Sequence, residues 1–454
     1  MSEVKRIKPT LSKGTRDFLP SEVAKRNYIF DTIKSVFRKY GFEEIETPAI
    51  ERLETLTGKY GEEGDKLLFK ILNSGDYLSE VRSKNLEVGS LTPQEVTPLI
   101  AEKGLRYDLT VPLARYVVQH QDNLAFPFRR FHLGPVWRAD RPQRGRYQEF
   151  YQCDADVIGS NSLLNEVELT EIYATVFQKL NIPAVIKINN RKLIEDIIAE
   201  VGVAERKGGV ITVIDKLDKI GKDGVATELT KLGLTNEQTG ELLNFIRLSY
   251  ADCLQAFPES TGAKEVATVM GYFKNNVMVQ FDASLMRGLD YYTGTIWEIV
   301  CDAVSIGSLC GGGRYDNLTE MFGGQNMSGV GISFGIERIY DVMEELNLFP
   351  TTISQGVKVL FVPREQSVEE FTFRQVDHLR KAGIPAEIFL GNVKKQKQFN
   401  YVEQKNIPYL VEVGENEQST GLFRLRNAKT RETHNDLSLQ AMIERLNSEN
   451  KTNC

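Results

Sequence analysis

FRRFHLGPVWRADRPQRGRYQEFYQCDADVIG, residues 128–159, is the most informative stretch of this chain. Two runs with strand-like alternation flank a short polar loop, ADRPQRGR, at residues 139–146. This pattern predicts an antiparallel hairpin. The stretch holds six arginines, whose planar guanidinium groups match phosphate oxygens two at a time, so the hairpin suits a polyphosphate ligand. The alternative interpretation is a surface hairpin whose charges are simply solvated.

The second strand of this hairpin is expected to have two different faces, because successive side chains of a strand point to opposite sides. The alternation places an aromatic ring, an amide and two carboxylates on one face, namely Phe150, Gln152, Asp154 and Asp156. The other face carries Tyr151, Cys153, Ala155 and Val157. The first face would therefore form a polar wall beside the arginine-rich loop.

A second nucleotide-binding feature is predicted near residues 329–346, GVGISFGIERIYDVMEEL. In its strand half the glycines and Ser333 share one face, which would let a flat ligand lie close to the backbone. A helix is expected to begin at about Ile336, so Arg338 would lie in its first turn, where the helix dipole favours anions.

The glycine-rich GGGRYD at residues 311–316 admits two interpretations, a phosphate loop or a tight turn that supports the site. No Lys-Ser/Thr pair follows it, which favours the turn. Neither a Walker-type loop nor a G-x-G-x-x-G that opens a helix occurs in the sequence.

Composition agrees with a large, ordinary globular protein. The chain has 454 residues with 41% hydrophobic and 26% charged residues, enough for two or three domains. We expect a cytosolic protein, since the sequence has no apolar run of 18 residues and no signal-peptide pattern. The five cysteines are scattered and the four histidines lack metal-ligand spacing, so we predict inert thiols and no metal site. His132 is expected to be structural.

Charge is distributed unevenly along the chain. The formal net charge of −6 argues against nucleic-acid binding over the whole surface. From Gly356 onward there are 15 Lys and Arg against 13 Asp and Glu, so the acidic surplus lies in the preceding residues. A near-neutral C-terminal part on an acidic body favours local contact with RNA.

Five segments together carry a specific resemblance. GFEEIETPAIE (residues 41–51), LRYDLTVPLARY (105–116), the hairpin, MRGLDYYTGTIWE with GGGRYD (286–298 and 311–316), and residues 329–346 follow in order at plausible spacing. They resemble the three motifs of class II aminoacyl-tRNA synthetases and the two signature peptides of the histidyl-tRNA synthetase family. The resemblance runs from about Gly14 to the C-terminus. It implies an α+β fold with an antiparallel-sheet catalytic domain, a helical insertion and a C-terminal α/β anticodon-binding domain.

The resemblance implies ATP-dependent ligation of L-histidine to tRNA(His) through a histidyl-adenylate. ATP is then a substrate, accompanied by Mg²⁺ without a dedicated protein site. Arg138 would contact the α-phosphate and the carboxylate, Arg146 and Arg338 would bracket the outer phosphates, Asp140 would hold the nucleotide or its Mg²⁺-linked end, and Phe150 would stack on adenine. Arg287 would act opposite Arg138 as the distinctive catalytic residue. The alternative for Arg287 is a salt bridge to Asp290.

For histidine, the resemblance implies contacts to both ring nitrogens and the amine. Asp156 would accept from one ring nitrogen and Tyr292 would meet the other, while Asp108, Thr110 and Gln152 would hold the α-amino group. Such a site leaves buried polar groups unpaired with the wrong amino acid. Tyr291 and Tyr292 would point to opposite faces of a strand, so at most one is expected in the pocket proper, with the other near it. Aromatic core packing is the alternative for both.

The breaks in pattern predict five segments. These are 1–189 (catalytic, motifs 1 and 2), 190–277 (helical insertion), 278–346 (catalytic, histidine signatures and motif 3), 347–355 (linker) and 356–454 (anticodon-binding domain). A homodimer is expected.

Two departures from the bacterial pattern stand out. Many bacterial members have Glu where this chain has Asp108 and Asp156. The shorter Asp at these positions is more like the eukaryotic branch of the family. Residues 72–104 are longer than the turn expected there and are interpreted as a surface loop near the active site.

Two other functions are alternatives to the ligation of histidine to tRNA that the resemblance implies. A non-catalytic regulatory paralogue, resembling the regulatory subunit of ATP phosphoribosyltransferase, tends to lack the C-terminal domain and the signature arginine. A synthetase for threonine or proline is disfavoured by the RGLDYYT segment and by the lack of a zinc-ligand set.

Overall fold

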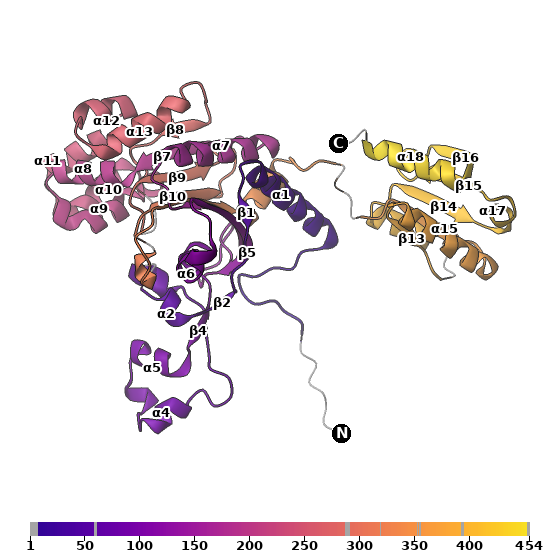
Figure 1. Ribbon diagram of the computed structural model, residues 1–454, viewed down its shortest axis with the longest axis horizontal. Helices are drawn as coiled ribbons and strands as arrows, with labels where there is room; N and C mark the ends of the chain where they lie inside the picture. Colours follow the sequence, from indigo (N-terminus) through magenta and orange to yellow (C-terminus); the bar gives the residue numbers. More distant parts are fainter. Residues whose placement is uncertain are drawn as a thin grey trace. The chain divides into compact units, whose positions relative to one another are not determined.

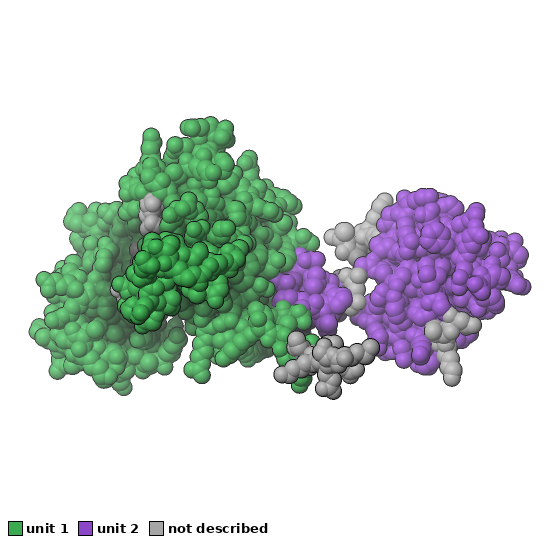
Figure 2. Space-filling model, turned by 90° about the horizontal axis from the view of Figure 1, so that it is seen from below, with its two compact units in different colours: residues 1–17, 28–349 green, residues 18–27, 350–454 purple. Residues whose placement is uncertain are grey.

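The computed structural model describes residues 8–58, 61–286, 291–317, 319–351, 353, 356–391 and 395–451. The chain forms two compact units, one of residues 1–17 and 28–349 and one of residues 18–27 and 350–454 (Figure 2). Each unit has a sheet and a core of its own.

The first unit is built on an eight-stranded sheet. This mostly antiparallel sheet with its helices confirms the predicted α+β class. In spatial order its strands are β1 Glu43–Glu44, β5 Phe128–Trp137, β6 Glu149–Ile158, β11 Gly329–Gly335, β10 Cys310–Tyr315, β9 Thr295–Val300, β7 Val185–Asn190 and β8 Val279–Phe281. Only the outermost pairs, β1 with β5 and β7 with β8, run parallel.

The predicted hairpin is confirmed as β5 and β6. The two strands pair along ten residues, from Phe128 opposite Ile158 to Trp137 opposite Glu149. Gln143 and Arg146 exchange backbone hydrogen bonds of 2.9 and 3.2 Å at the tip of the connecting loop. Gly145 lies between them with φ of +70°, a conformation that glycine adopts without strain.

The two faces of β6 differ as predicted. Cys153, Ala155 and Val157 are buried in the main core, which also receives the apolar residues of α1 Pro20–Lys39, α7 Leu164–Lys179 and α14 Ile336–Glu345. α1 ends just before Gly41, which has φ of +76°, a conformation that commonly terminates a helix. Because the helices cover one face of the sheet, the face that carries Gln152, Asp154 and Asp156 remains for the site (Figure 1).

The predicted helical insertion is confirmed between β7 and β8. Its helices, which cluster beside that edge of the sheet in Figure 1, are α8 Arg191–Glu200, η3 Ala204–Arg206, α9 Lys207–Ile214, α10 Leu217–Lys231, α11 Asn236–Phe245, α12 Tyr250–Ala256 and α13 Thr261–Tyr272. They have a separate apolar core. Polar side chains cap several helices, as Thr235 and Ser249 do for α11 and α12.

Residues 72–104 differ from the surface loop that we predicted. They form α4 Ser79–Ser83, η1 Val88–Ser90 and α5 Pro93–Ile100, ahead of strand β4 Lys103–Leu105. Thr92 and Glu95 close a capping box at the start of α5, a local signal that the sequence analysis overlooked. β4 pairs between β2 Ile50–Arg52 and β3 Lys70–Ile71 in a small sheet that also adjoins α2 Leu53–Leu56, and α3 is Gly61–Lys66.

Helices connect the small sheet to the β5–β6 hairpin, and a short helix lies between β10 and β11. α6 Thr110–His120 and η2 Gln121–Asn123 precede β5, and η4 Glu320–Phe322 lies between β10 and β11. Leu109, Val111, Leu113 and Val117 of the α6 region are buried.

The second unit carries a five-stranded mixed sheet, as predicted for the C-terminal domain. The spatial order of its strands is β13 Ala386–Ile388, β12 Val359–Pro363, β14 Tyr409–Val413, β15 Leu422–Asn427 and β16 Thr433–Ser438. Its helices are η5 Gln366–Val368, α15 Glu369–Lys381, α16 Lys395–Gln404, α17 Glu415–Thr420 and α18 Leu439–Lys451. The hairpin of β15 and β16 and the helix α18 were not predicted.

None of the helices in the described ranges combines the length and the hydrophobicity that crossing a bilayer requires.

Candidate active site

A cavity of about 490 Å³ opens on the polar face of the main sheet. Its wall includes side chains from the loop before α6, the β5–β6 hairpin, β9, β10, β11 and the start of α14. Ten residues predicted from the sequence line it, namely Asp108, Thr110, Arg138, Asp140, Arg146, Phe150, Gln152, Tyr291, Tyr292 and Arg338. The fold therefore brings together residues that lie up to 230 positions apart in the sequence.

Arg138 lies at the end of β5, where backbone contacts fix its position. Its Nε donates to the carbonyl of Tyr107 at 3.1 Å, and the guanidinium lies 4.2 Å from the centre of the Tyr107 ring and 5.2 Å from that of Phe150. An arginine stacked between aromatic rings is held in place while the rest of its planar fork stays available to an anion.

The hairpin loop adds a second cation. Arg146 lies 3.6 Å from Asp140 across the loop, with both side chains partly exposed. Such an exposed ion pair is weak in water, so a polyphosphate can compete for Arg146.

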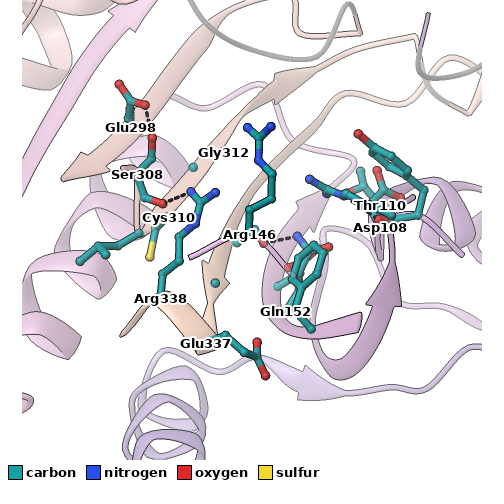
Figure 3. Close-up of a pocket in the computed structure, with 18 of the residues that line it drawn as sticks. Asp108, Thr110, Arg146, Gln152, Glu298, Ser308, Cys310, Gly312, Glu337 and Arg338 are labelled. Atoms are coloured by element: carbon teal, nitrogen blue, oxygen red, sulfur yellow. Dashed lines mark hydrogen bonds between the residues drawn. The ribbon is translucent and has the colours of Figure 1, made fainter. Parts of the chain in front are cut away.

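Arg338 supplies a third cation from the first turn of α14, as predicted. Its Nε donates to the carbonyl of Gly145 at 2.6 Å, and its Nη1 donates to the carbonyl of Ser308. Ser308 in turn donates to Glu298. In Figure 3 these residues gather at one end of the cavity, and Asp108 and Thr110 lie at the other.

Asp108 occupies the end of the cavity away from Arg338. Its Oδ1 accepts the backbone N–H groups of Thr110 at 3.2 Å and of Val111 at 3.1 Å, at the start of α6. These bonds fix the carboxylate at a helix N-terminus, where negative charge is favoured. Gln152 donates from Nε2 to the Ser333 hydroxyl at 2.6 Å.

Asp156 lies deeper in the protein than the wall of the large cavity, although a contact with histidine was predicted for it. It lines a small adjoining cavity of about 20 Å³ and is absent from the wall of the larger one. Its Oδ2 lies 2.6 Å from Nη2 of Arg130, which is fully buried, and its Oδ1 accepts from the Tyr315 hydroxyl at 2.5 Å. A Cβ on Gly331 of the neighbouring strand would approach that Oδ1 to 1.9 Å, so this position requires glycine.

Asp154, two residues earlier, lines both cavities, although the sequence analysis gave it no role. Its side chain is buried, and its Oδ1 has no hydrogen-bond partner among the described residues. Burial raises the pKa of Asp154 from 3.8 to about 7, and nearby Arg130 limits that rise. The alternation of β6 had already placed Asp154 on the polar wall, so the signal existed in the sequence.

Tyr291 and Tyr292 both line the cavity, which corrects the expectation that at most one would. That expectation assumed a strand, but β9 begins only at Thr295, so the two rings are free of strand alternation. Their centroids lie 5.0 Å apart in an edge-on arrangement. Burial raises the pKa of the Tyr292 hydroxyl, and Asp108, Asp154 and Asp156 raise it further, which keeps the group protonated.

GGGRYD is not the tight turn that we predicted but part of β10, in the middle of the sheet. Its glycines serve close packing instead. A Cβ on Gly312 would lie 2.3 Å from the carbonyl of Gly331, and one on Gly313 would lie 2.5 Å from the Tyr292 ring. The small residues therefore make room for the tyrosine at the cavity.

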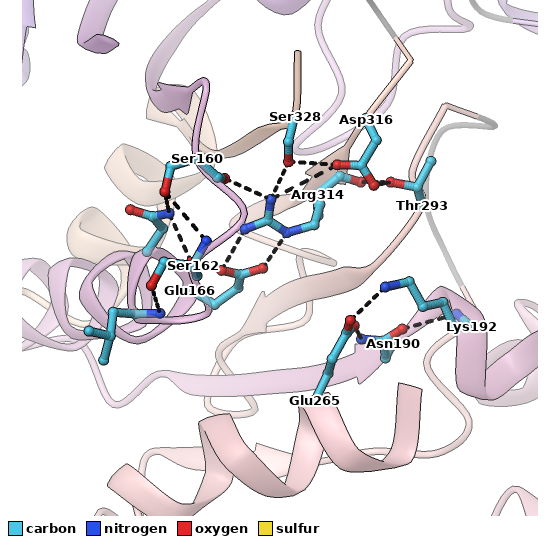
Figure 4. Close-up of polar contacts among 12 residues, drawn as sticks. Ser160, Ser162, Glu166, Asn190, Lys192, Glu265, Thr293, Arg314, Asp316 and Ser328 are labelled. Atoms are coloured by element: carbon cyan, nitrogen blue, oxygen red, sulfur yellow. Dashed lines mark hydrogen bonds and ion pairs between the residues drawn. The ribbon is translucent and has the colours of Figure 1, made fainter. Parts of the chain in front are cut away.

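Arg314 of the same strand is the centre of a buried polar network (Figure 4). It forms a two-pronged pair with Glu166 of α7 at 2.6 and 2.8 Å and donates to the Ser328 hydroxyl at 2.5 Å. Ser328 and Thr293 each donate to Asp316 at 2.6 Å. Thr293 directly follows the two tyrosines, so this network anchors the end of that segment to β10.

Arg287 and Asp290 lie outside the described residues. The roles proposed for them remain predictions.

Several other lining residues were not singled out from the sequence. They include Tyr107, Tyr147, Glu298, Ser308, Cys310 and Glu337. Ser333, which was predicted to share the ligand-facing side of β11 with the glycines, does line the cavity. Ser308 lies in a connection without a motif, and only the folded chain brings it to Arg338.

The arginines of the cavity gather away from Asp108. Arg146 and Arg338 lie at one end, where Asp140 and Glu298 are their acidic neighbours, and Arg138 lies beside Phe150. Asp108 and Asp154 belong to the part of the wall without these arginines. Such a cavity suits two ligands at once, a polyanion beside the arginines and a small molecule with cationic or N–H groups at the acidic end.

Comparisons with known proteins agree with this arrangement. A family model described as histidyl-tRNA synthetase matches residues 14–82 and 101–339, and one described as an anticodon binding domain matches residues 357–449. The unmatched residues 83–100 fall in the segment that carries η1 and α5.

Curated relatives are similar over most of their length. The histidine–tRNA ligase of Bacteroides fragilis (strain YCH46) is 49% identical over 94% of this chain and 96% of its own, and that of Phocaeicola vulgatus is 47% identical over the same shares. Among solved structures, histidyl-tRNA synthetase from Nostoc sp. PCC 7120 superposes with a TM-score of 0.81 at 29% identity, covering 98% of this chain and 100% of that one.

Proposed function

This chain belongs to the histidyl-tRNA synthetase family, and from that premise we propose how its cavity joins L-histidine to tRNA. The enzyme is a histidine–tRNA ligase of class II, and the family uses ATP as a substrate. The observation that carries the proposal is the cavity of about 490 Å³, which brings the three arginines of the predicted phosphate site together with Asp108, Gln152 and Tyr292.

The proposed mechanism begins with placement of the two substrates. ATP would lie along the arginine side, with Phe150 against the adenine and Arg146 and Arg338 beside the outer phosphates. Mg²⁺ would arrive with the nucleotide and offset part of its charge. Histidine would lie with its ammonium group at Asp108, Thr110 and Gln152 and its ring toward Tyr292 and the acidic floor of Asp154 and Asp156.

Activation then joins the histidine carboxylate to the α-phosphate. The carboxylate oxygen attacks the α-phosphorus, the bond to the bridging oxygen breaks, and pyrophosphate leaves. Arg138 is proposed to hold both reacting groups, because it lies beside Phe150 within the cavity and its fork can contact two anions. Arg287 is proposed to stabilise the charge that develops at the α-phosphate from the opposite side, a role that rests on the family resemblance.

The second step transfers histidine from the adenylate to tRNA(His) and releases AMP. The second unit, matched by the anticodon-binding family, is proposed to hold the tRNA. We also propose that the enzyme is cytoplasmic and acts as a homodimer, because two-fold dimers are the commonest symmetric assemblies of soluble proteins.

A pyrophosphate-exchange assay tests the proposal. With each of the twenty amino acids and labelled pyrophosphate, we expect exchange into ATP to depend on histidine, because the ring and the ammonium group must both find partners. Faster exchange with another amino acid would contradict the specificity, and no exchange with any amino acid would contradict the activity itself.

A further inference from the structure

The loop that joins β5 to β6, residues 138–148, rests on a segment near the N-terminus, residues 12–17. The backbone N–H of Gln148 donates to the carbonyl of Gly14 at 2.8 Å. Gly14 has φ of +80°, and a Cβ at this position would lie 2.6 Å from the Gln148 side chain and 2.9 Å from Pro142. A larger residue here would therefore push the loop away from the segment.

Arg16 extends this contact to the residue that follows Arg146. Its Nη1 donates to the Tyr147 hydroxyl at 3.1 Å and to Oδ1 of Asp341 at 3.2 Å. The Tyr147 hydroxyl donates in turn to Oδ2 of Asp341 at 2.8 Å. The guanidinium also lies 4.4 Å from the centre of the Tyr147 ring. These contacts form a closed ring of hydrogen bonds that joins the N-terminal segment, the loop and α14.

The ring of hydrogen bonds is partly shielded from solvent. The side chains of Arg16 and Asp341 are 26% and 16% exposed. Burial raises the pKa of Tyr147 to about 12, and its hydrogen bond to Asp341 contributes to the rise. The hydroxyl therefore keeps its proton and donates it to the carboxylate. Hydrogen bonds with charged partners are stronger than those between neutral groups, so this arrangement fixes the Tyr147 ring.

The position of Tyr147 matters because the ring lines the cavity of about 490 Å³ and directly follows Arg146 in the chain. The same loop is held at another point by Arg338, whose Nε donates to the carbonyl of Gly145 at 2.6 Å. A loop depends on such tertiary contacts for its position, and a shift of about 1 Å in a group that orients a substrate can cost about 100-fold in rate. Contacts outside the cavity thus decide where Arg146 lies within it.

We propose that residues 12–17 belong to the nucleotide subsite, with Arg16 as a positioning residue that acts on Arg146 through Tyr147. This inference rests on the proposed function and adds to its ATP subsite a segment that precedes the first of the class II motifs, at residues 41–51. Arg16 is not among the residues that line the cavity in the described part of the chain. Its effect on ATP must therefore pass through the loop.

A double-mutant cycle in the full chain tests the inference, with Arg16→Ala, Tyr147→Phe and the variant that carries both changes. Phe keeps the ring and removes the hydroxyl that joins Arg16 to Asp341. In pyrophosphate exchange we expect each single change to raise the KM for ATP about 5- to 30-fold, because hydrogen bonds to charged groups are lost. The KM for histidine should stay within about twofold of wild type. The double variant should be no worse than the more severe single variant, since both changes break the same contact.

The matched control is Arg364→Ala. Arg364 pairs with Glu412 at 3.0 Å in the second unit, whose described residues contribute none to the cavity, so both KM values should stay unchanged. Arg16→Lys should recover only part of the affinity for ATP, because an ammonium group cannot reproduce the planar fork stacked on a ring. Melting temperatures give a measurement that does not depend on turnover. The shift on adding ATP with Mg²⁺ should shrink in Arg16→Ala, and the shift on adding histidine should not.

Three outcomes would overturn the inference. The first is an unchanged KM for ATP with an unchanged ATP-dependent thermal shift. The second is a double variant whose rise in KM equals the product of the two single rises, which would mean that Arg16 does not act through Tyr147. The third is an equal rise of both KM values with a lower melting temperature, which would mean a general structural role. Failure of the wild type to exchange with histidine would instead overturn the proposed function.

Discussion

At the scale of single residues, one buried carboxyl links the site to stability. The pKa of the Asp154 carboxyl is about 7 in the folded chain, whereas its ordinary value without burial is 3.8. The folded form thus holds its proton more tightly, so its contribution to stability is complete below pH 3.8 and is lost as pH rises through about 7. Without ligand, the protein should lose this part of its stability toward neutral pH.

A first prediction concerns the pH dependence of stability in unliganded wild type and in Asp154→Asn. Because Asn imitates the protonated carboxyl at every pH, the variant should gain on wild type between pH 3.8 and about 7 and then keep its advantage. The gap in unfolding free energy should reach roughly 2–4 kcal/mol. Denaturant unfolding followed by circular dichroism measures it. Equal pH profiles for the two proteins would show that Asp154 stays charged and compensated.

At the residue scale, the sequence predicted the two faces of β6 but not how deeply each side chain is buried. Alternation correctly put Phe150, Gln152, Asp154 and Asp156 on one wall of β6, but it could not rank them by depth. Depth depends on the partner strands, because Arg130 and Tyr315 reach Asp156 from β5 and β10. Sequence spacing carries no information on those cross-strand distances.

At the scale of elements, β10 determines what the cavity can hold. Its glycines admit the Tyr292 ring, and its Arg314 ties the strand to α7 and to the chain after the two tyrosines. GGGRYD was predicted to be a turn because no Lys-Ser/Thr pair follows it, and three consecutive glycines do not point to a strand either. Here close contact with β11 overrides that tendency, and no local signal reveals it.

A second prediction concerns this network. Arg314→Gln should cost about 3–5 kcal/mol of stability, because Glu166 is fully buried and would be left without its counter-charge. The matched control is Arg129→Gln, whose pair with Glu168 at 2.7 Å is partly exposed on both sides and should be worth about 1 kcal/mol or less. Urea unfolding of both variants gives the comparison.

The double variant Arg314→Met with Glu166→Leu separates stability from positioning. Replacing both charges by apolar groups should recover much of the lost stability. Turnover in pyrophosphate exchange should stay low, since Ser328 and Asp316 would lose their contacts with the Arg314 guanidinium, at 2.5 and 4.0 Å. Full recovery of turnover would show that the network has a purely structural role.

At the scale of the whole molecule, the proposed function divides the reaction between the two units. All cavity residues belong to residues 28–349, and the C-terminal strands and helices have their own core. In the second unit a basic side chain lies near an exposed aromatic ring. The Arg426 guanidinium is 5.5 Å from the centre of the Phe399 ring. Cations beside aromatic rings are the usual means of holding unpaired RNA.

A third prediction follows from this division. A chain that ends at Gln355 should keep histidine-dependent pyrophosphate exchange while losing most transfer of histidine to tRNA. Exchange activity itself shows that the shortened chain is folded. If it charges tRNA as well as the full chain does, the second unit does not bind tRNA.

Point variants of the full chain test more finely whether the second unit binds tRNA. Arg426→Ala should raise the KM for tRNA and reduce the salt dependence of binding. Arg374→Ala, on α15 and paired with Glu370 at 2.6 Å, changes the same charge on an exposed helix and should have little effect. Neither should alter exchange.

The buried carboxyls at the acidic floor also have a meaning for the living cell. A protein that completes its own interior with a substrate is least durable when that substrate is scarce, because ligand binding stabilises the native state by mass action. Amino-acid starvation would then shorten the lifetime of the synthetase at the moment when it has nothing to charge. Supply of the nutrient would thus set the amount of enzyme through its rate of degradation, without any dedicated regulator.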